Sequence, residues 1–169
     1  MRPFNIKRLV ILIVSLSLII AFGVNSVAQD KVKMKDKRYW VTTKREMIKI
    51  DDVEGHVLMI TEARGIDVDS GIIGVGRTFY DLIKGNGTAI GYTTNHYPNG
   101  DITFSKSEGK VVTTLSPQGK PMMSAEGTFT TYKGTGTREG IKGGGPWKIK
   151  ILGEDIAVMD WEGEFTIKK

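Results

Sequence analysis

Glycine recurs about every eight residues in this chain, and the segments between glycines are rich in β-branched and aromatic residues. The sequence has 21 glycines among its 169 residues. Short segments of this composition, bounded by turn-forming residues, are typical of β-strands. Beyond the first 28 residues, no apolar pattern keeps the 3.6-residue period for the length of a full helix. The chain is therefore expected to form mostly antiparallel β-sheet.

The first 28 residues have the three parts of a secretory signal peptide. A basic start is followed by an uncharged apolar stretch, Leu9–Val24, and by the small residues Ser26 and Ala28. This order predicts cleavage after Ala28 and export of the mature chain, either to a periplasm or out of the cell. The alternative is an uncleaved membrane anchor. The apolar stretch is shorter than the roughly 20 residues that span a bilayer, so no stable membrane insertion is expected after cleavage.

The charge distribution argues against a nucleic-acid partner. The net charge of +5 falls to +2 once the three basic residues of the leader are removed, and from Ile50 onward 13 basic residues face 16 acidic ones, a net of −3. A nucleic-acid binder needs a basic patch on its folded body. Much of the remaining basicity lies in residues 29–37, which are expected to form a flexible basic tether. The alternative for this stretch is a loose contact with anionic lipid or envelope polymer.

The chain contains no cysteine, so disulfides and thiol chemistry are excluded. An exported domain without disulfides must be stabilised by its core alone. About 140 mature residues are enough for that, since a chain of this size buries more than 60% of its unfolded surface. Residues 38–169 are therefore expected to form one domain.

One hairpin can be derived in detail. Pro98-Asn99-Gly100 lies between two β-prone runs, and these residues suit the successive positions of a type I turn followed by a left-handed glycine. Such a three-residue loop would pair Tyr97 with Asp101. The register then places His96 opposite Ile102.

Side-chain alternation divides this hairpin into two faces. The largely apolar face is expected to point inward, and it carries Ile90, Tyr92, Thr94, His96, Ile102 and Phe104. The polar face, expected outside, carries Thr93, Asn95, Tyr97, Asp101, Thr103 and Ser105. In the last strand, Trp161, Gly163, Phe165 and Ile167 alternate with Asp160, Glu162, Glu164 and Thr166.

Roughly eight strands with turns at such intervals suggest a sandwich or a barrel. Glycines inside strands, at Gly91, Gly127 and Gly163, favour the barrel, because tight coiling needs residues that accept bends. The predicted fold class is all-β, a single antiparallel eight-stranded β-barrel after a signal peptide.

The segment Glu139–Trp147, with sequence EGIKGGGPW, follows a Thr/Gly-rich strand and precedes two closing strands. It resembles the closing hairpins of the small eight-stranded β-barrels of the allene oxide cyclase and dirigent type, in which a Gly-Ile-x-Gly-x-Gly turn precedes an aromatic residue and a strand. The likeness covers the last third of the chain. It implies an apolar ligand inside the barrel and steering of cyclisation or coupling without a cofactor. None of the catalytic positions of that group can be matched to this chain.

The candidate site residues are those expected to line the interior. A barrel of eight strands has room for one small ligand. Ligand-binding positions are predicted at His96, Tyr92, Phe104, Trp147, Trp161 and Glu62. For His96, the alternative is a strand-end histidine bonded to backbone or solvent. For Glu62, the alternative is that the strand ends at Thr61 and that Glu62 and Arg64 are both solvated. The two histidines lack the close ligand spacing of a metal site, so neither metal nor cofactor is predicted.

Three classes of function remain open. The first is an exported barrel that binds a small hydrophobic molecule in its lumen. The second is a cofactor-free cyclase or isomerase, which needs His96 or Glu62 to project into a cavity. The third is a structural or interaction protein of the cell envelope, which needs a filled interior. No catalytic residue is assigned, and whether the chain is an enzyme stays open.

Overall fold

A computed structural model describes residues 30–167, which form eight strands and one short 3-10 helix. The elements, in chain order, are β1 (Asp30–Ile50), β2 (His56–Asp67), β3 (Ile73–Ile83), β4 (Asn86–His96), β5 (Ile102–Leu115), β6 (Pro121–Gly134), η1 (Gly136–Arg138), β7 (Lys142–Ile151) and β8 (Ile156–Ile167). No helix in this part of the chain is long and apolar enough to cross a membrane.

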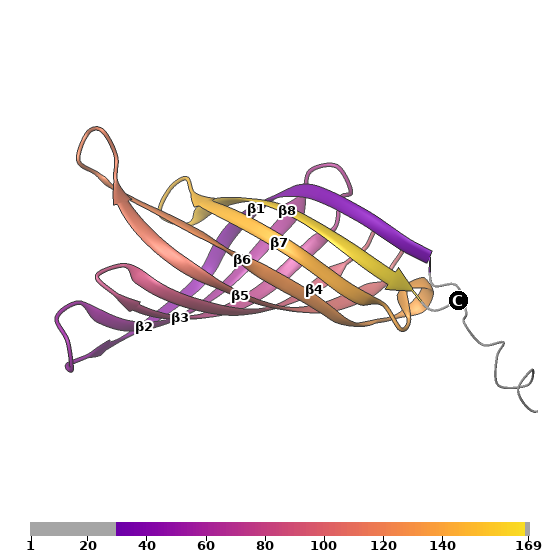
Figure 1. Cartoon of the computed structure of the whole chain (residues 1–169), viewed down its shortest axis with the longest axis horizontal. Helices are drawn as coiled ribbons and strands as arrows, with labels where there is room; N and C mark the ends of the chain where they lie inside the picture. Colours follow the sequence, from indigo (N-terminus) through magenta and orange to yellow (C-terminus); the bar gives the residue numbers. More distant parts are fainter. Residues whose placement is uncertain (1–29, 168–169) are drawn as a thin grey trace, which may run out of the picture. The chain divides into compact units, whose positions relative to one another are not determined.

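The strands form a closed antiparallel barrel. Each strand pairs with the next, and β8 returns to pair with β1, so the strand order around the barrel is the order of the sequence (Figure 1). Closure satisfies the strand edges that an open sheet would leave unpaired. The predicted fold class, an all-β antiparallel eight-stranded barrel, is confirmed.

The two ends of the barrel differ. We call the end where β1 begins and β8 ends the terminal end; it carries the turns at residues 68–72 and 97–101 and the η1 segment at 135–141. The opposite, far end carries the turns at 51–55, 84–85, 116–120 and 152–155. At the far end, the β1–β2 and β5–β6 hairpins reach beyond the neighbouring turns (Figure 1).

The central hairpin has the predicted register. The backbone N–H of Tyr97 donates to the carbonyl of Asp101 at 2.9 Å, and the N–H of Gly100 donates to the carbonyl of Tyr97 at 2.9 Å. Gly100 has a φ of +86°, the left-handed conformation that the loop requires. His96 pairs with Ile102, as predicted.

The faces of this hairpin are the reverse of those predicted. Tyr92 is 54% exposed, and His96 is exposed on the outside, whereas Asn95, Thr103 and Ser105 are buried inside the barrel. Alternation separates two faces but does not say which one is buried. The prediction assumed an apolar interior. This barrel instead has a largely polar lumen at its terminal end and leaves apolar side chains outside, including Ile60, Phe79 and Ile90.

The predicted tether is also wrong over the residues that the structure describes. Residues 30–37 form the first part of β1 and pair with β8 from Asp30↔Ile167 to Lys37↔Asp160. Asp36 is only 9% exposed, and its carboxylate accepts hydrogen bonds from the backbone N–H groups of Ser70, at 2.9 Å, and Asp69, at 3.1 Å. The domain therefore begins before Arg38. The predicted signal peptide, residues 1–28, lies outside the described residues.

The predicted alternation of the last strand is confirmed. Phe165 is 5% exposed and Trp161 is partly buried, while the acidic side chains that alternate with them are exposed. A buried apolar cluster of Leu82, Ala89 and Val111 lies toward the far end. The interior is therefore apolar toward the far end and more polar toward the terminal end.

Candidate ligand site in the barrel lumen

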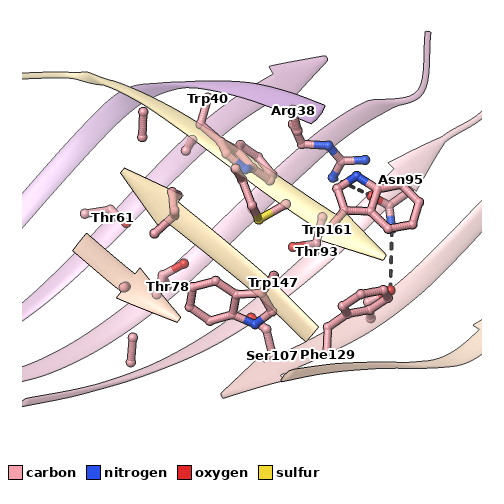
Figure 2. Close-up of a pocket in the computed structure, with 18 of the residues that line it drawn as sticks. Arg38, Trp40, Thr61, Thr78, Thr93, Asn95, Ser107, Phe129, Trp147 and Trp161 are labelled. Atoms are coloured by element: carbon pink, nitrogen blue, oxygen red, sulfur yellow. Dashed lines mark hydrogen bonds between the residues drawn. The ribbon is translucent and has the colours of Figure 1, made fainter. Parts of the chain in front are cut away.

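The barrel encloses a cavity of about 170 Å³ to which all eight strands contribute side chains. Its walls include Trp40 from β1, Phe129 from β6, Trp147 from β7 and Trp161 from β8, which surround the same space in Figure 2. The cavity extends to Ile151, the last residue of β7, toward the far end of the barrel. An engineered apolar cavity of about 150 Å³ binds benzene, so this space accommodates a molecule of about one ring.

Phe129 and Trp161 fix each other's orientation. Their ring centroids lie 5.8 Å apart at 88°, an edge-to-face arrangement, and Phe165 packs against Phe129 with centroids 6.1 Å apart. Edge-to-face pairs are favoured because the positive edge of one ring meets the negative face of the other. The wall near the terminal end is therefore ordered rather than free to collapse into the cavity.

Two tryptophans lie directly over glycine backbone. A Cβ at Gly74 would lie 2.9 Å from the Trp40 ring, and a Cβ at Gly109 would lie 2.5 Å from the Trp147 ring. Both distances are shorter than any side chain permits, so only glycine leaves room for the indoles. Gly74 in β3 and Gly109 in β5 thus let large rings lie against the barrel wall.

Hydroxyl groups form a belt around the middle of the cavity. The belt comprises Thr42, Thr61, Thr78, Thr93 and Ser107, which come from β1 to β5. A hydroxyl can donate or accept a hydrogen bond. The belt can therefore adapt to a polar group on a bound molecule, while the aromatic wall contacts its apolar part.

A buried ion pair lies at the terminal end of the cavity. Arg38 donates from Nε to Oδ1 of Asp67 at 2.7 Å and from Nη2 to Oδ2 at 2.6 Å. The two side chains are 6% and 0% exposed. A bidentate pair of this geometry offsets the cost of taking both charges out of water.

Further hydrogen bonds surround this ion pair. Arg38 Nη1 donates to Asn95 Oδ1 at 2.8 Å, and the Trp161 indole N–H donates to Asp67 Oδ1 at 3.1 Å. Asn95 in turn donates to the Thr103 hydroxyl at 3.3 Å. The guanidinium also lies 5.1 Å from the centroid of the Trp40 ring, within the range of a cation–π interaction. The network joins β1, β2, β4, β5 and β8 through side chains alone.

The Trp147 indole N–H differs from that of Trp161. Its Nε1 atom is buried and has no hydrogen-bond partner among residues 30–167. Ser70 Oγ and Arg138 Nε are the other two buried side-chain atoms without a partner in the described residues. The unpaired donor lies in a residue that lines the cavity.

Of the six predicted ligand-binding residues, the structure places two on the cavity wall, Trp147 and Trp161. The other four lie outside the barrel. Tyr92 and His96 are exposed, and the Phe104 ring lies 5.6 Å from Lys133 Nζ on the outer surface. Glu62 Oε1 lies 3.6 Å from Arg77 Nε, again on the outer face, because the neighbours that line the cavity are Thr61 and Ala63. The expectation that these four side chains point into the lumen is wrong.

Sequence reasoning missed the polar residues at the terminal end. Asn95 is predicted on the outer face, and Asp67 is not among the predicted ligand-binding residues. The signal that could have found them is alternation read across several strands. Arg38, Asp67 and Asn95 each lie on the side of their strand that also carries a small or hydroxyl residue, namely Thr42, Ala63 and Thr93.

Comparison with solved structures shows the fold. The barrel resembles the pterocarpan synthase dirigent protein GePTS1, with a TM-score of 0.50 and 10% sequence identity over 87% of this chain and 94% of that chain. PsPTS1, another pterocarpan synthase dirigent protein, aligns with a TM-score of 0.45 and 11% identity over 83% and 97%. No protein-family profile matches the sequence, and no curated protein does. The predicted resemblance to dirigent-type barrels is thus confirmed at the level of the fold.

Proposed function

We propose that the barrel binds one small, mostly apolar molecule in its lumen. The observation that carries this proposal is the cavity of about 170 Å³ inside a closed barrel, walled by aromatic rings that include three tryptophans. Aromatic walls with a few polar groups are the usual lining of small-molecule sites. A purely structural role would be served better by a filled interior, because empty space forfeits packing energy.

The size of the cavity limits the ligand. Drug-sized ligands occupy pockets of roughly 300–1,000 Å³, which is more than this lumen offers. A molecule of one ring with a short substituent fits this volume. The fold likeness to a pterocarpan synthase dirigent protein supports the lumen as the place for a small organic molecule and leaves the identity of that molecule open.

Export is part of the same proposal. The signal peptide expected over residues 1–28 would leave a single residue, Gln29, before β1 begins at Asp30. Cleavage after Ala28 would then release a chain whose first strand starts at once. N-terminal sequencing of the protein recovered from the exported fraction of the native host should begin at Gln29. Recovery of an intact leader would overturn this part of the proposal.

Binding is tested with a matched pair of variants on β4. Thr93 lines the cavity and Thr94, the next residue, faces outward. Thr93→Leu should fill part of the lumen and weaken binding of acetophenone at least tenfold, whereas Thr94→Leu should leave it unchanged. Isothermal titration of the folded variants measures both affinities. Native mass spectrometry of the purified wild-type protein should also detect a small copurified molecule.

The results that would overturn the proposal are specific. Equal affinities in Thr93→Leu and Thr94→Leu would show that acetophenone binds elsewhere. Wild-type protein that binds no ring-sized probe and copurifies with no small molecule would remove the lumen as a ligand site.

A further inference from the structure

We propose that the outer face of β1 to β4 binds a second copy of this chain, so that the barrel forms a symmetric dimer. This inference does not depend on what the lumen holds. It rests on the distribution of side chains over the outside of the barrel.

One half of the outer wall is apolar. Alternation places large apolar side chains on the outside of four neighbouring strands, and between 39% and 54% of each residue is exposed. We call this set the apolar face; its members are Tyr39 and Val41 on β1, Ile60 and Ile66 on β2, Ile73 and Phe79 on β3, and Ile90 and Tyr92 on β4. Soluble monomers rarely expose a contiguous apolar patch of more than a few hundred Å².

The other half of the outer wall is mostly polar. Between the barrel ends, the outward positions of β5 to β8 carry charged and hydroxyl side chains, namely Lys106, Glu108, Lys110, Glu126, Thr128, Thr130, Lys148, Lys150, Asp160, Glu162 and Glu164. The lysines of residues 31–37 extend this polar surface onto the first part of β1. Exposure of apolar groups is therefore concentrated on one side of the barrel wall.

The apolar face has a regular pattern on its two central strands. Ile66 pairs with Ile73, and six residues away along β2, Ile60 pairs with Phe79. Glu62 and Arg77 lie between these two apolar pairs and are themselves register partners. Glu62 Oε1 lies 3.6 Å from Arg77 Nε, and the Arg77 side chain is 71% exposed, so its guanidinium keeps donors for a second carboxylate.

This pattern is complementary to itself. A twofold axis that lies in the interface, parallel to β2 and β3 and between them, exchanges the two strands, so that each residue faces the register partner of its counterpart. Ile66 then faces Ile73 of the second copy, and Ile60 faces Phe79. Glu62 faces Arg77 of the second copy, so the polar side chains are paired as well.

The charges of this region also favour a second copy. The outward ionisable groups among and beside the apolar side chains are three acids and three bases, namely Glu46, Glu62, Asp81, Lys44, Arg64 and Arg77. Two such neutral faces do not repel each other, whereas an anionic membrane surface attracts a basic patch. Phe, Tyr and Arg, which all occur here, are enriched in protein interfaces.

The size of the apolar face matches a stable interface. A side chain of this kind buries on the order of 150 Å² when it is completely covered, and about half of each is exposed here. The face therefore offers roughly 600 Å² per copy, and two copies roughly 1,200 Å², the lower limit for a stable interface before the polar side chains are counted.

A matched pair of lysine substitutions tests the position of the interface. Ile60 in the apolar face and Val112 on the outside of β5 are 46% and 47% exposed. Ile60→Lys should raise the dissociation constant of the dimer at least tenfold, because it places an unpaired ammonium group against Phe79 of the second copy. Val112→Lys should leave the dissociation constant unchanged. Sedimentation velocity over a concentration series measures both, and urea denaturation checks that both variants are folded.

Mixing two charge-reversal variants tests the twofold arrangement. Glu62→Arg and Arg77→Glu should each weaken self-association at least tenfold, because like charges then face each other across the interface. In an equimolar mixture, each contact between copies again joins a guanidinium to a carboxylate, so a heterodimer should form with nearly the wild-type dissociation constant. The pair within each chain stays mismatched in the mixture, so recovery reports on the contact between copies. Native mass spectrometry identifies the heterodimer by its mass.

Four results would overturn the proposal. The first is a wild-type protein that stays monomeric at micromolar concentrations and above. The second is equal weakening by Ile60→Lys and Val112→Lys, and the third is a mixture of charge variants that forms no heterodimer. An assembly of three or more copies would contradict the twofold axis. A monomeric wild type that binds phosphatidylcholine vesicles would assign the apolar face to a membrane instead.

Discussion

Removing one member of the buried Arg38–Asp67 pair leaves the other charged and without compensation. Asp67→Ala should therefore lower the free energy of unfolding by about 3–5 kcal/mol. Replacing both charges with apolar side chains, in Arg38→Met with Asp67→Leu, should recover most of that loss, because no unpaired charge remains. Urea denaturation followed by tryptophan fluorescence measures both. A double variant as unstable as Asp67→Ala would show that the charges are not the reason for the loss.

Residues also show where sequence reasoning reached its limit. The turn residues Pro98, Asn99 and Gly100 determine the register of their hairpin locally, so the pairing of Tyr97 with Asp101 could be derived. Which face is buried depends on residues far away in the chain. Asn95 lies inside, where it accepts a hydrogen bond from Arg38, 57 residues earlier in the chain. No local pattern contains that information.

At the scale of elements, β1 was the strand least visible in the sequence. Residues 30–37 are rich in lysine, which favours a solvated segment, but their lysines all lie on the outer face and the alternating residues Val32, Met34 and Asp36 lie on the other. The two-residue alternation of a strand is present in residues 30–37, but their many lysines favoured the prediction of a solvated tether. In contrast, β8 was predicted correctly because its polar residues alternate with aromatic ones.

Trypsin distinguishes a tether from a strand. Lys33, Lys35 and Lys37 would be cut quickly in a flexible tether, whereas a strand paired with β8 resists cleavage until the barrel opens. Limited proteolysis of the folded mature chain, with the products identified by mass spectrometry, should leave these sites intact while exposed turns are cut. Early cleavage after Lys35 would contradict the assignment of residues 30–37 to the barrel.

At the scale of the whole molecule, the two ends of the barrel should respond to pH in opposite directions. At the far end, hydrogen bonds to Asp52 and then Asp81 raise the pKa of His56. Its ring nitrogens lie 2.6 Å and 2.9 Å from these carboxylates, and both can donate only when the ring is protonated. Because the pKa of His56 is higher in the folded than in the unfolded chain, its protonated ring stabilises the folded state below about pH 6.5. This stabilisation is lost as the pH rises through the pKa of His56 in the folded protein.

At the terminal end, the pH dependence of stability has the opposite sign. Burial alone would raise the pKa of Asp36, but hydrogen bonds from Ser70, Asp69 and Lys37 outweigh it, and the pKa is lowered. The ionised Asp36 carboxylate therefore stabilises the folded state above about pH 3.9. This stabilisation is lost as the pH falls through the lowered pKa of Asp36. Hydrogen-exchange protection factors should therefore fall in the 51–55 turn on alkalisation and in the 68–72 turn on acidification. His56→Gln should abolish the first change only, and a pH response in both turns of that variant would contradict the assignment.

The seam between β1 and β8 joins the two ends of the domain, with Asp30 opposite Ile167. Chain segments this distant in sequence meet slowly, because closing a long loop costs entropy before any contact rewards it. The hydrogen bond between Asp67 and Trp161 spans 94 residues and needs that seam to be closed. The lumen is therefore expected to close only at the last stage of folding, after nearly the whole chain has been synthesised.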